Sequence, residues 1–217
     1  MASPLKIEIF SDVICPWCFI GKRRLDTVLK DGGVGEVELE WKPYQLYPNL
    51  PSGGMARAEF LRARYGESAD GSRTPERIRI EADEVGITFD YASIDRVPNT
   101  LSAHRLLAMA GEMGCQHELA EALFQAYFCS GSDIGTVDAL VACAGSVGMT
   151  HVVVRDFLNS DAGVEATMKD IARAFDVGVV GVPCYRLGGA FILPGAQTPG
   201  VMVQFIERAK KRLAETK

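Results

Sequence analysis

The amino-terminal 43 residues contain the pattern that most restricts the fold, two short strands joined by one helix. Apolar and polar residues alternate over residues 5–10, which predicts a strand that ends at Ser11-Asp12. A second alternation over residues 37–42 predicts another strand, which stops before Pro43. Apolar residues between them recur at helical spacing, and this connection is long enough for the right-handed crossover of parallel strands. A βαβ unit therefore begins the chain.

Beyond this unit the character of the chain changes twice. From about residue 44 to about residue 162 the alternation disappears, and helical segments follow one another. A helix is expected at residues 165–175, and strand pattern then returns at residues 184–187 and 190–193 around a Gly-Gly turn, before a last helix. Helix starts inside the middle block are expected at Thr74-Pro75, with Pro75 in the first helical position, at Asn99-Thr100 and at Thr136.

The element order predicts an α/β fold built as βαβ, a helical block, one helix and then ββα. We predict that residues 1–43 and 163–217 form one domain around a split sheet, and that residues 44–162 form a large all-helical insertion. The end of the first strand would then lie at the sheet edge where open α/β folds bind ligands.

Composition and charge exclude several classes of function. Hydrophobic residues make up 47% of the chain and charged residues 24%, as in ordinary soluble globular proteins. The net charge of −5 provides no broad basic surface for phosphates, so nucleic acid is not an expected partner. The sequence shows neither a signal peptide nor the ~20 apolar residues of a membrane span, and we expect a cytoplasmic protein without membrane contacts.

The motif Cys15-Pro16-Trp17-Cys18 follows the first strand and begins the predicted helix. Two intervening residues place both sulfurs on one helical turn, as thiol-disulfide exchange requires. The free amides and positive dipole end of a helix favour the thiolate over the thiol at Cys15, whereas burial favours the protonated form of Cys18. Pro16 suits the first helical position. Trp17 is expected to project outward beside the sulfurs and offer a partner an apolar surface.

Other uses of a Cys-x-x-Cys pair are less consistent with this chain. A structural zinc site needs four ligands, usually with a second close pair. The other cysteines stand alone at positions 115, 129, 143 and 184, and the three histidines are scattered, so no metal is expected. A purely structural disulfide does not suit a cytoplasmic chain of this size, and the remaining thiols are most simply buried apolar residues.

A second segment also favours redox chemistry. The run Gly178-Val179-Val180-Gly181-Val182-Pro183 leads into the first strand of the carboxyl-terminal hairpin. A proline at a strand entry is a candidate cis position, and a cis bond would present the Val182 backbone to an extended substrate by strand addition. The alternative is an ordinary trans proline that starts an edge strand.

These two motifs together resemble the DsbA-like branch of the thioredoxin superfamily, and more narrowly the FrnE-type proteins, which are similar to 2-hydroxychromene-2-carboxylate isomerases and kappa-class glutathione transferases. The likeness covers nearly the whole chain. It extends to three further stretches: residues 10–21, Pro98-Asn99-Thr100 with Ala103-His104-Arg105-Leu106, and Pro194-Gly195-Ala196-Gln197.

The resemblance implies a thioredoxin-like fold with a helical insertion and a cis-proline beside the active site. It implies that Cys15 is the nucleophile, that Cys18 is the resolving thiol and that Pro183 is the cis residue. In the isomerase and transferase relatives a serine stands where this chain has Cys15 and activates glutathione. A cysteine at that position favours redox chemistry here.

Two residues remain open at this stage. Cys184 follows Pro183, so it is either a core thiol or a third thiol that forms an alternative disulfide with the active pair. His104 lies in an apolar helical stretch, where a hydrogen-bonded core histidine is commoner than a general base, and it is left out of the catalytic set.

The sequence thus predicts an enzyme, a disulfide oxidoreductase that acts on protein or small-molecule thiols and disulfides. Its expected site consists of Cys15, Cys18 and Pro183, with Pro16, Trp17 and Val182 contacting substrate. No bound organic cofactor is expected, and glutathione is one candidate co-substrate. A glutathione-dependent isomerase or transferase and a redox-switched, chaperone-like binding module are the alternatives. The sequence leaves the direction of exchange open, and it leaves the oligomeric state open between monomer and homodimer.

Overall fold

The computed structural model describes residues 4–215 and confirms the predicted βαβ unit. Strand β1 (Leu5–Ser11), helix α1 (Pro16–Lys30) and strand β2 (Val37–Pro43) follow one another, and the two strands pair in parallel along their whole length. Strand β2 extends one residue further than predicted, because Pro43 pairs with Ser11 at the end of an edge strand, where a missing N–H is tolerated. The outer ends of the predicted domain, residues 1–3 and 216–217, lie outside the described residues.

The carboxyl-terminal hairpin completes the sheet. Strands β5 (Cys184–Leu187) and β6 (Phe191–Pro194) are antiparallel, and β5 lies antiparallel to β1, so the strand order is β2-β1-β5-β6. The second strand of the hairpin begins one residue later than predicted. Ala190 belongs to the turn instead, since its N–H donates to the Leu187 carbonyl at 3.1 Å.

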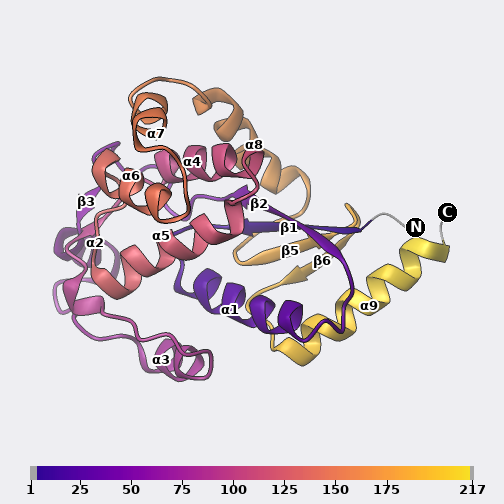
Figure 1. Ribbon diagram of the computed structural model, residues 1–217. Helices are drawn as coiled ribbons and strands as arrows, with labels where there is room; N and C mark the ends of the chain where they lie inside the picture. Colours follow the sequence, from indigo (N-terminus) through magenta and orange to yellow (C-terminus); the bar gives the residue numbers. More distant parts are fainter. Residues whose placement is uncertain (1–3, 216–217) are drawn as a thin grey trace.

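Helices cover both faces of this sheet (Figure 1). Helices α1 and α9 (Pro199–Glu215) lie on one face, while α4 (Leu101–Glu112) and α8 (Val164–Asp176) lie on the other. Ile7 and Ile9 of β1 join the main core with α1 and α9, whereas Phe10 belongs to a smaller cluster on the α8 side. Among the described residues, no helix combines the length and apolar character needed to cross a bilayer.

The segment between β2 and α8 is mostly helical, as predicted. Its other α-helices are α2 (Arg57–Tyr65), α3 (Glu76–Asp83), α5 (Gln116–Ser130), α6 (Val137–Ser146) and α7 (His151–Leu158), with a 3-10 turn at Tyr91–Ser93. It also contains a two-stranded sheet, β3 (Met55–Ala56) with β4 (Arg96–Val97), which the all-helical prediction omitted. Strands of two residues are too short to give a periodic pattern.

The predicted helix starts are confirmed to within two residues, with one change of role. Helix α6 starts after Thr136, whose side chain accepts a hydrogen bond from the Ala139 N–H at 3.3 Å. Helix α4 starts after Thr100, and the Asn99 side chain accepts from the Leu101 N–H instead. Pro75 is the cap residue of α3 and not its first helical residue.

A cluster of aromatic side chains packs the first turn of α1 against the helical segment between β2 and α8. Phe19 is fully buried, and its ring stacks on that of Phe124 with centroids 5.1 Å apart and planes 9° apart. Phe89 and Phe128 contact the same ring at 6.0 and 6.3 Å. Because Phe19 directly follows Cys18, this packing sets the position of the cysteine motif.

A polar network makes a second link between α1 and α5. Lys22 Nζ lies 2.9 Å from the Asp26 carboxylate and 3.0 Å from that of Glu121. His117 Nε2 contacts Asp26 at 2.6 Å, and Trp41 Nε1 donates to His117 Nδ1 at 3.2 Å. Burial alone would raise the pKa of Asp26, but the hydrogen bonds from His117 and Lys22 hold it below its usual range. The active-site helix is therefore held to the insertion by apolar and charged contacts together.

Replacing Phe19 should test the apolar link. We expect Phe19→Ala to lower the free energy of unfolding by about 3–5 kcal/mol, because it leaves a cavity among three rings. Urea denaturation followed by circular dichroism measures this change. The matched control is Phe175→Ala on α8, where the side chain is 64% exposed and the expected loss is below about 0.5 kcal/mol. Equal losses in the two variants would contradict the assignment.

Candidate active site

The cysteine motif adopts the geometry that the sequence predicts at the junction of β1 and α1. Cys15 is the N-cap of α1 with extended backbone angles, φ −94° and ψ 113°, and Pro16 occupies the first helical position. The Cys15 N–H donates to the Asp12 carbonyl at 3.0 Å, which turns the chain from strand to helix. Both cysteines therefore lie within one turn, at the carboxyl end of β1.

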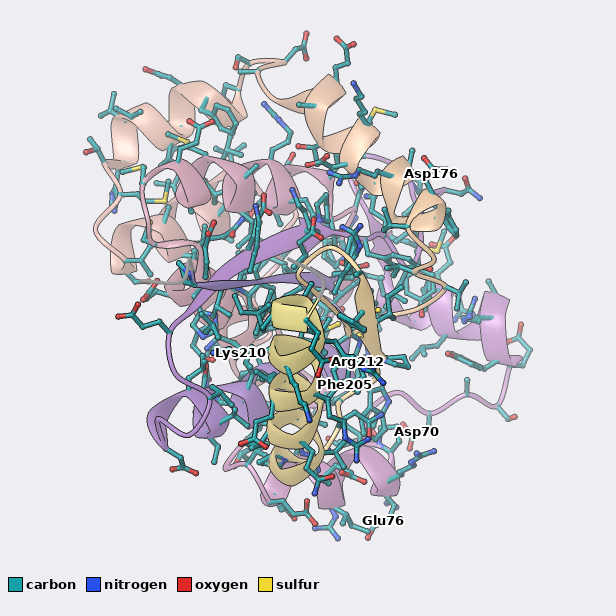
Figure 2. The ribbon with its side chains drawn as sticks, turned by 90° about the vertical axis from the view of Figure 1, so that its right-hand side faces the viewer. Asp70, Glu76, Asp176, Phe205, Lys210 and Arg212 are labelled. Atoms are coloured by element: carbon teal, nitrogen blue, oxygen red, sulfur yellow. The ribbon has the colours of Figure 1, made fainter. Side chains whose placement is uncertain are left out.

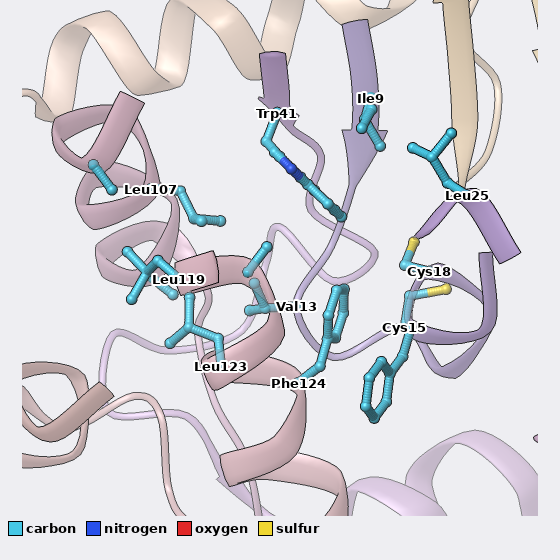
Figure 3. Packing of buried hydrophobic residues seen from close by; sticks show 14 of the residues in the cluster. Ile9, Val13, Cys15, Cys18, Leu25, Trp41, Leu107, Leu119, Leu123 and Phe124 are labelled. Carbon is cyan, nitrogen blue, oxygen red and sulfur yellow. The ribbon is translucent and has the colours of Figure 1, made fainter. Parts of the chain in front are cut away.

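The two sulfurs are close to each other and shielded from solvent (Figure 3). Cys15 is 4% exposed and Cys18 is 1% exposed, and both are free thiols. Burial, followed by its hydrogen bond with Cys15, raises the pKa of Cys18 well above its ordinary value, and contacts with the Ser11 side chain and the Asp12 backbone oppose this only in part. Cys18 is thus held as a thiol, as the sequence predicts.

The surroundings of the Cys15 sulfur differ from the prediction. The N–H groups of Cys18 and Phe19 donate to the Cys15 carbonyl, at 3.0 and 3.3 Å, and no side-chain capping bond reaches the sulfur. The Cys15 S–H instead points at the Val182 carbonyl, 3.7 Å away. In the described structure the Cys15 sulfur is therefore paired with the cis-proline loop and not with the amides of α1.

The Val182-Pro183 peptide bond is cis, as predicted, and lies against the start of α1. Gly21 makes this approach possible, since a Cβ there would stand 3.2 Å from Pro183 Cγ and 2.5 Å from Tyr185 Oη. Pro183 is buried, and its carbonyl accepts from the Gly195 N–H at 2.8 Å. The cis-proline segment is therefore fixed between the helix and the hairpin.

The three residues predicted to contact substrate are all partly exposed around the thiols. Pro16 follows Cys15 in α1, and the Val182 carbonyl contacts the Cys15 sulfur. Trp17 is partly exposed, and its contact with a partner stays a prediction. The Arg77 guanidinium of α3 stands over its ring, 5.2 Å from the centroid, so Trp17 forms a contact between α1 and α3.

The structure decides between the two interpretations of Cys184. Its side chain packs with Phe10, Ala174 and Val179 in the smaller cluster, whereas Cys15 and Cys18 belong to the main core. Burial raises the pKa of Cys184 to about 11. Cys184 is therefore a core thiol on the other side of the sheet, and an alternative disulfide with the active pair is disfavoured.

His104 is a core histidine, as predicted. Its Nε2 lies 3.0 Å from the Tyr44 carbonyl and 3.5 Å from the Asp12 carboxylate, which is itself fully buried. The other Asp12 oxygen accepts from the Leu46 N–H at 2.7 Å. Within residues 4–215, no three His, Cys, Asp or Glu side chains come together as a metal site would need.

Sequence reasoning missed two residues that shape the site. Gly21 permits the close approach of α1 to Pro183, and a glycine inside a predicted helix is the signal that was available. Ser11 places a buried hydroxyl beside Cys18, and a serine at a strand end carries no signal that distinguishes this role from a turn residue.

Comparison with known proteins identifies the family. The model of the DsbA-like thioredoxin domain matches residues 6–207. The chain belongs to the DsbA-like thioredoxin family. It is a disulfide oxidoreductase at the level of that family, with a thioredoxin-like fold as predicted.

Relatives of this DsbA-like chain align over almost its full length. It is 25% identical to the uncharacterized protein YwbO of Bacillus subtilis (strain 168) over 207 residues, which cover 95% of this chain and 98% of YwbO. It superposes on a probable DsbA oxidoreductase from Streptomyces coelicolor with a TM-score of 0.80 and 26% identity, covering 95% of this chain and 90% of the other.

Two more distant structures share the fold. A 2-hydroxychromene-2-carboxylate isomerase superposes with a TM-score of 0.67 and 16% identity, over 98% of this chain and 99% of its own. The cytosolic disulfide reductase DsbM of Pseudomonas aeruginosa, solved with glutathione, superposes with a TM-score of 0.60 and 14% identity, over 97% and 98%. The resemblance to DsbA-like oxidoreductases and to the isomerase is thereby confirmed.

The raised pKa of Cys18 gives the site a defined pH dependence. Only the thiolate attacks a disulfide, and Cys18 is protonated until the pH exceeds its raised pKa. The rate at which Cys18 displaces a thiol bound to Cys15 should therefore keep rising about tenfold per unit through and above about pH 8.5, where the rate for an ordinary cysteine thiol levels off. Rapid-quench mass spectrometry of a preformed mixed disulfide measures this rate. A rate that levels off at or below about pH 8.5 would contradict the assigned pKa direction.

Proposed function

We propose that this chain exchanges disulfides through a mixed disulfide at Cys15, which Cys18 then resolves. One observation carries the proposal: two free thiols share one helical turn, and the outer one contacts the carbonyl that precedes a cis-proline. The two environments differ in the way the two roles require, because Cys18 is the more deeply buried and is held protonated.

The chemistry balances without a bound cofactor. The Cys15 thiolate attacks one sulfur of a substrate disulfide, a new sulfur–sulfur bond forms, and the first substrate thiolate leaves and takes up a proton. Cys18 then loses its proton and attacks the Cys15 sulfur, which closes the Cys15–Cys18 disulfide and releases the second substrate thiol. The substrate gains two electrons and the protein loses two. The same steps in reverse oxidise a dithiol.

The loop before Pro183 supplies the docking edge for an extended substrate in this proposal. The Val182 N–H makes none of the backbone hydrogen bonds found in the described loops, and Val180 two residues earlier is 88% exposed. A substrate strand that pairs with Val182 would displace its carbonyl contact with Cys15 and uncover the sulfur. Burial of Cys15 in the free protein is compatible with attack on this basis.

We infer that glutathione is a co-substrate that restores the dithiol or the disulfide. Support comes from the DsbM reductase, which has the same fold and was solved with glutathione. Cys15 stands where the resemblance places the serine of the isomerases and transferases, so exchange is the chemistry that its thiol favours over their reactions.

Removal of the resolving thiol should trap the intermediate. We expect Cys18→Ser to accumulate close to one equivalent of mixed disulfide at Cys15 when it is treated with oxidised glutathione, because the second step has lost its nucleophile. Mass spectrometry of the intact protein and its peptides measures the adduct. The matched control Cys15→Ser should form no adduct at position 18 on that timescale, since Cys18 is buried and protonated. An adduct at Cys18 in the control would contradict the proposal, because Cys18 would then be the attacking thiol.

A further inference from the structure

A pocket of about 440 Å³ lies beside the cysteine motif, within the size range of ligand sites in proteins. Ile14 and Pro16, the neighbours of Cys15 in the chain, form one wall, and the opposite wall comes from α2, the loop after it and the start of α3. Six of its eighteen lining residues are aromatic: Tyr47, Phe60, Tyr65, Tyr91, Tyr127 and Phe128.

Several of these rings contact one another in the pocket wall. Tyr47 and Phe60 meet edge to face with centroids 4.7 Å apart, and Tyr91 lies tilted against Phe128 at 6.1 Å. Aromatic pairs prefer these tilted geometries, and an additional ring placed among them gains both apolar burial and edge-to-face contacts. Tyr65 is 62% exposed, so a bound side chain can pack against its ring.

The pocket is close enough to Cys15 to bind one part of a substrate while its disulfide reacts with that thiol. Burial raises the pKa of both Tyr47 and Tyr91, and the charge of Cys15 adds to the increase at each phenol. Since Pro16 lines the pocket and directly follows Cys15, an extended chain advancing ~3.3 Å per residue reaches it within a few residues of the substrate cysteine.

Three arginines, which we call the arginine rim, lie in the lining of the pocket or on the helices beside it. Arg64 stands over the rings of Tyr47 and Tyr65, at 5.1 and 5.7 Å from their centroids, and Arg77 stands over Trp17. Arg73 lines the opening. Arg73 also faces the Asp70 carboxylate, whose pKa is lowered first by its hydrogen bonds with Ser72 and then by the charges of Arg73 and Arg57.

Asp70 is the acidic residue of the same lining, and Figure 2 shows it at the surface near α3. Its carboxylate accepts from the N–H and the hydroxyl of Ser72, at 2.8 and 2.6 Å. The lining thus contains two arginines, Arg57 and Arg73, and one carboxylate, so its net charge is opposite in sign to that of the chain as a whole, which is −5.

We propose that this pocket selects peptide substrates that carry an aromatic residue near the reactive cysteine, with acidic residues beside the aromatic one. The inference rests on the proposed exchange at Cys15 and adds the class of substrate. Aromatic burial would supply the affinity, and the arginine rim would favour negatively charged segments.

Synthetic peptides test the aromatic preference. Each contains one cysteine, linked by a disulfide to glutathione, and either tyrosine or alanine two residues later, in an otherwise identical acidic sequence. We expect kcat/KM for the tyrosine peptide to exceed that for the alanine peptide about tenfold. The ratio should approach one in Tyr65→Ala, which removes a wall, and in Ala69→Trp, which fills the pocket. Met113→Ala, at an exposed apolar residue outside the pocket, is the control that should keep it.

The arginine rim is tested in parallel with lysine-flanked versions of the tyrosine peptide. The wild-type protein should prefer the acidic version, and Arg73→Glu should abolish or reverse that preference. Lys211→Glu on α9 makes the same change in net charge at an exposed position away from the pocket and should leave the preference intact. Equal loss in both variants would mean that net charge, and not the rim, attracts the substrate.

A binding measurement separates this inference from the exchange chemistry. Fluorescence anisotropy with labelled peptides that contain serine in place of cysteine reports affinity without any reaction. Selective binding of the tyrosine peptide without turnover of any disulfide would support the pocket and overturn the proposed function. Turnover with a ratio near one, together with equal affinities, would overturn the pocket and leave the function standing. Turnover of small aromatic disulfides without any preference among the peptides would also overturn the proposed peptide selection.

Discussion

The active site depends on the packing of Phe19, the residue next to Cys18. Its ring stacks on Phe124 of α5 and touches two more rings, so the first turn of α1 is buried between the sheet and the insertion. An exposed helix end would leave both sulfurs in water. Here the second sulfur is enclosed, and the desolvation that raises the pKa of Cys18 follows directly from this packing.

The remaining site components come from segments far apart in the chain. Cys15 lies where β1 meets α1, and the carbonyl that contacts its sulfur belongs to a loop more than 160 residues later in the sequence. Antiparallel pairing of β1 with β5 brings these segments together, and Gly21 lets the helix approach the cis-proline closely. The insertion then adds an aromatic pocket and Arg77 above Trp17. The two thiols and the aromatic pocket are thus supplied by different parts of one fold.

Periodicity and spacing in the sequence were sufficient for the elements that frame the site. The strand alternation before Cys15, Pro16 in the first helical position and the glycine-rich approach to Pro183 each have a direct physical reading, and the structure agrees with them. The expected domain division between residues 43 and 44 and between 162 and 163 stays a prediction. The main hydrophobic core contains residues from both parts, including those around Phe19.

What the sequence did not predict depends on contacts across long separations. The Cys15 sulfur faces the Val182 carbonyl and not the helix amides, Trp17 stacks with Arg77, and Cys184 faces away from the active pair. None of these follows from local pattern, since each depends on which side of a strand or helix a distant residue approaches. The tyrosines of the pocket are likewise spread over 80 residues.

The most direct test of the account is an equilibrium titration of the full chain in buffers of reduced and oxidised glutathione, followed by acid quenching, alkylation and peptide mapping. The account predicts a single two-electron transition in which Cys15 becomes linked to Cys18 while Cys115, Cys129, Cys143 and Cys184 stay alkylatable after unfolding. A transition that links either member of the pair to another cysteine, or a pair that stays reduced in every buffer, would contradict it.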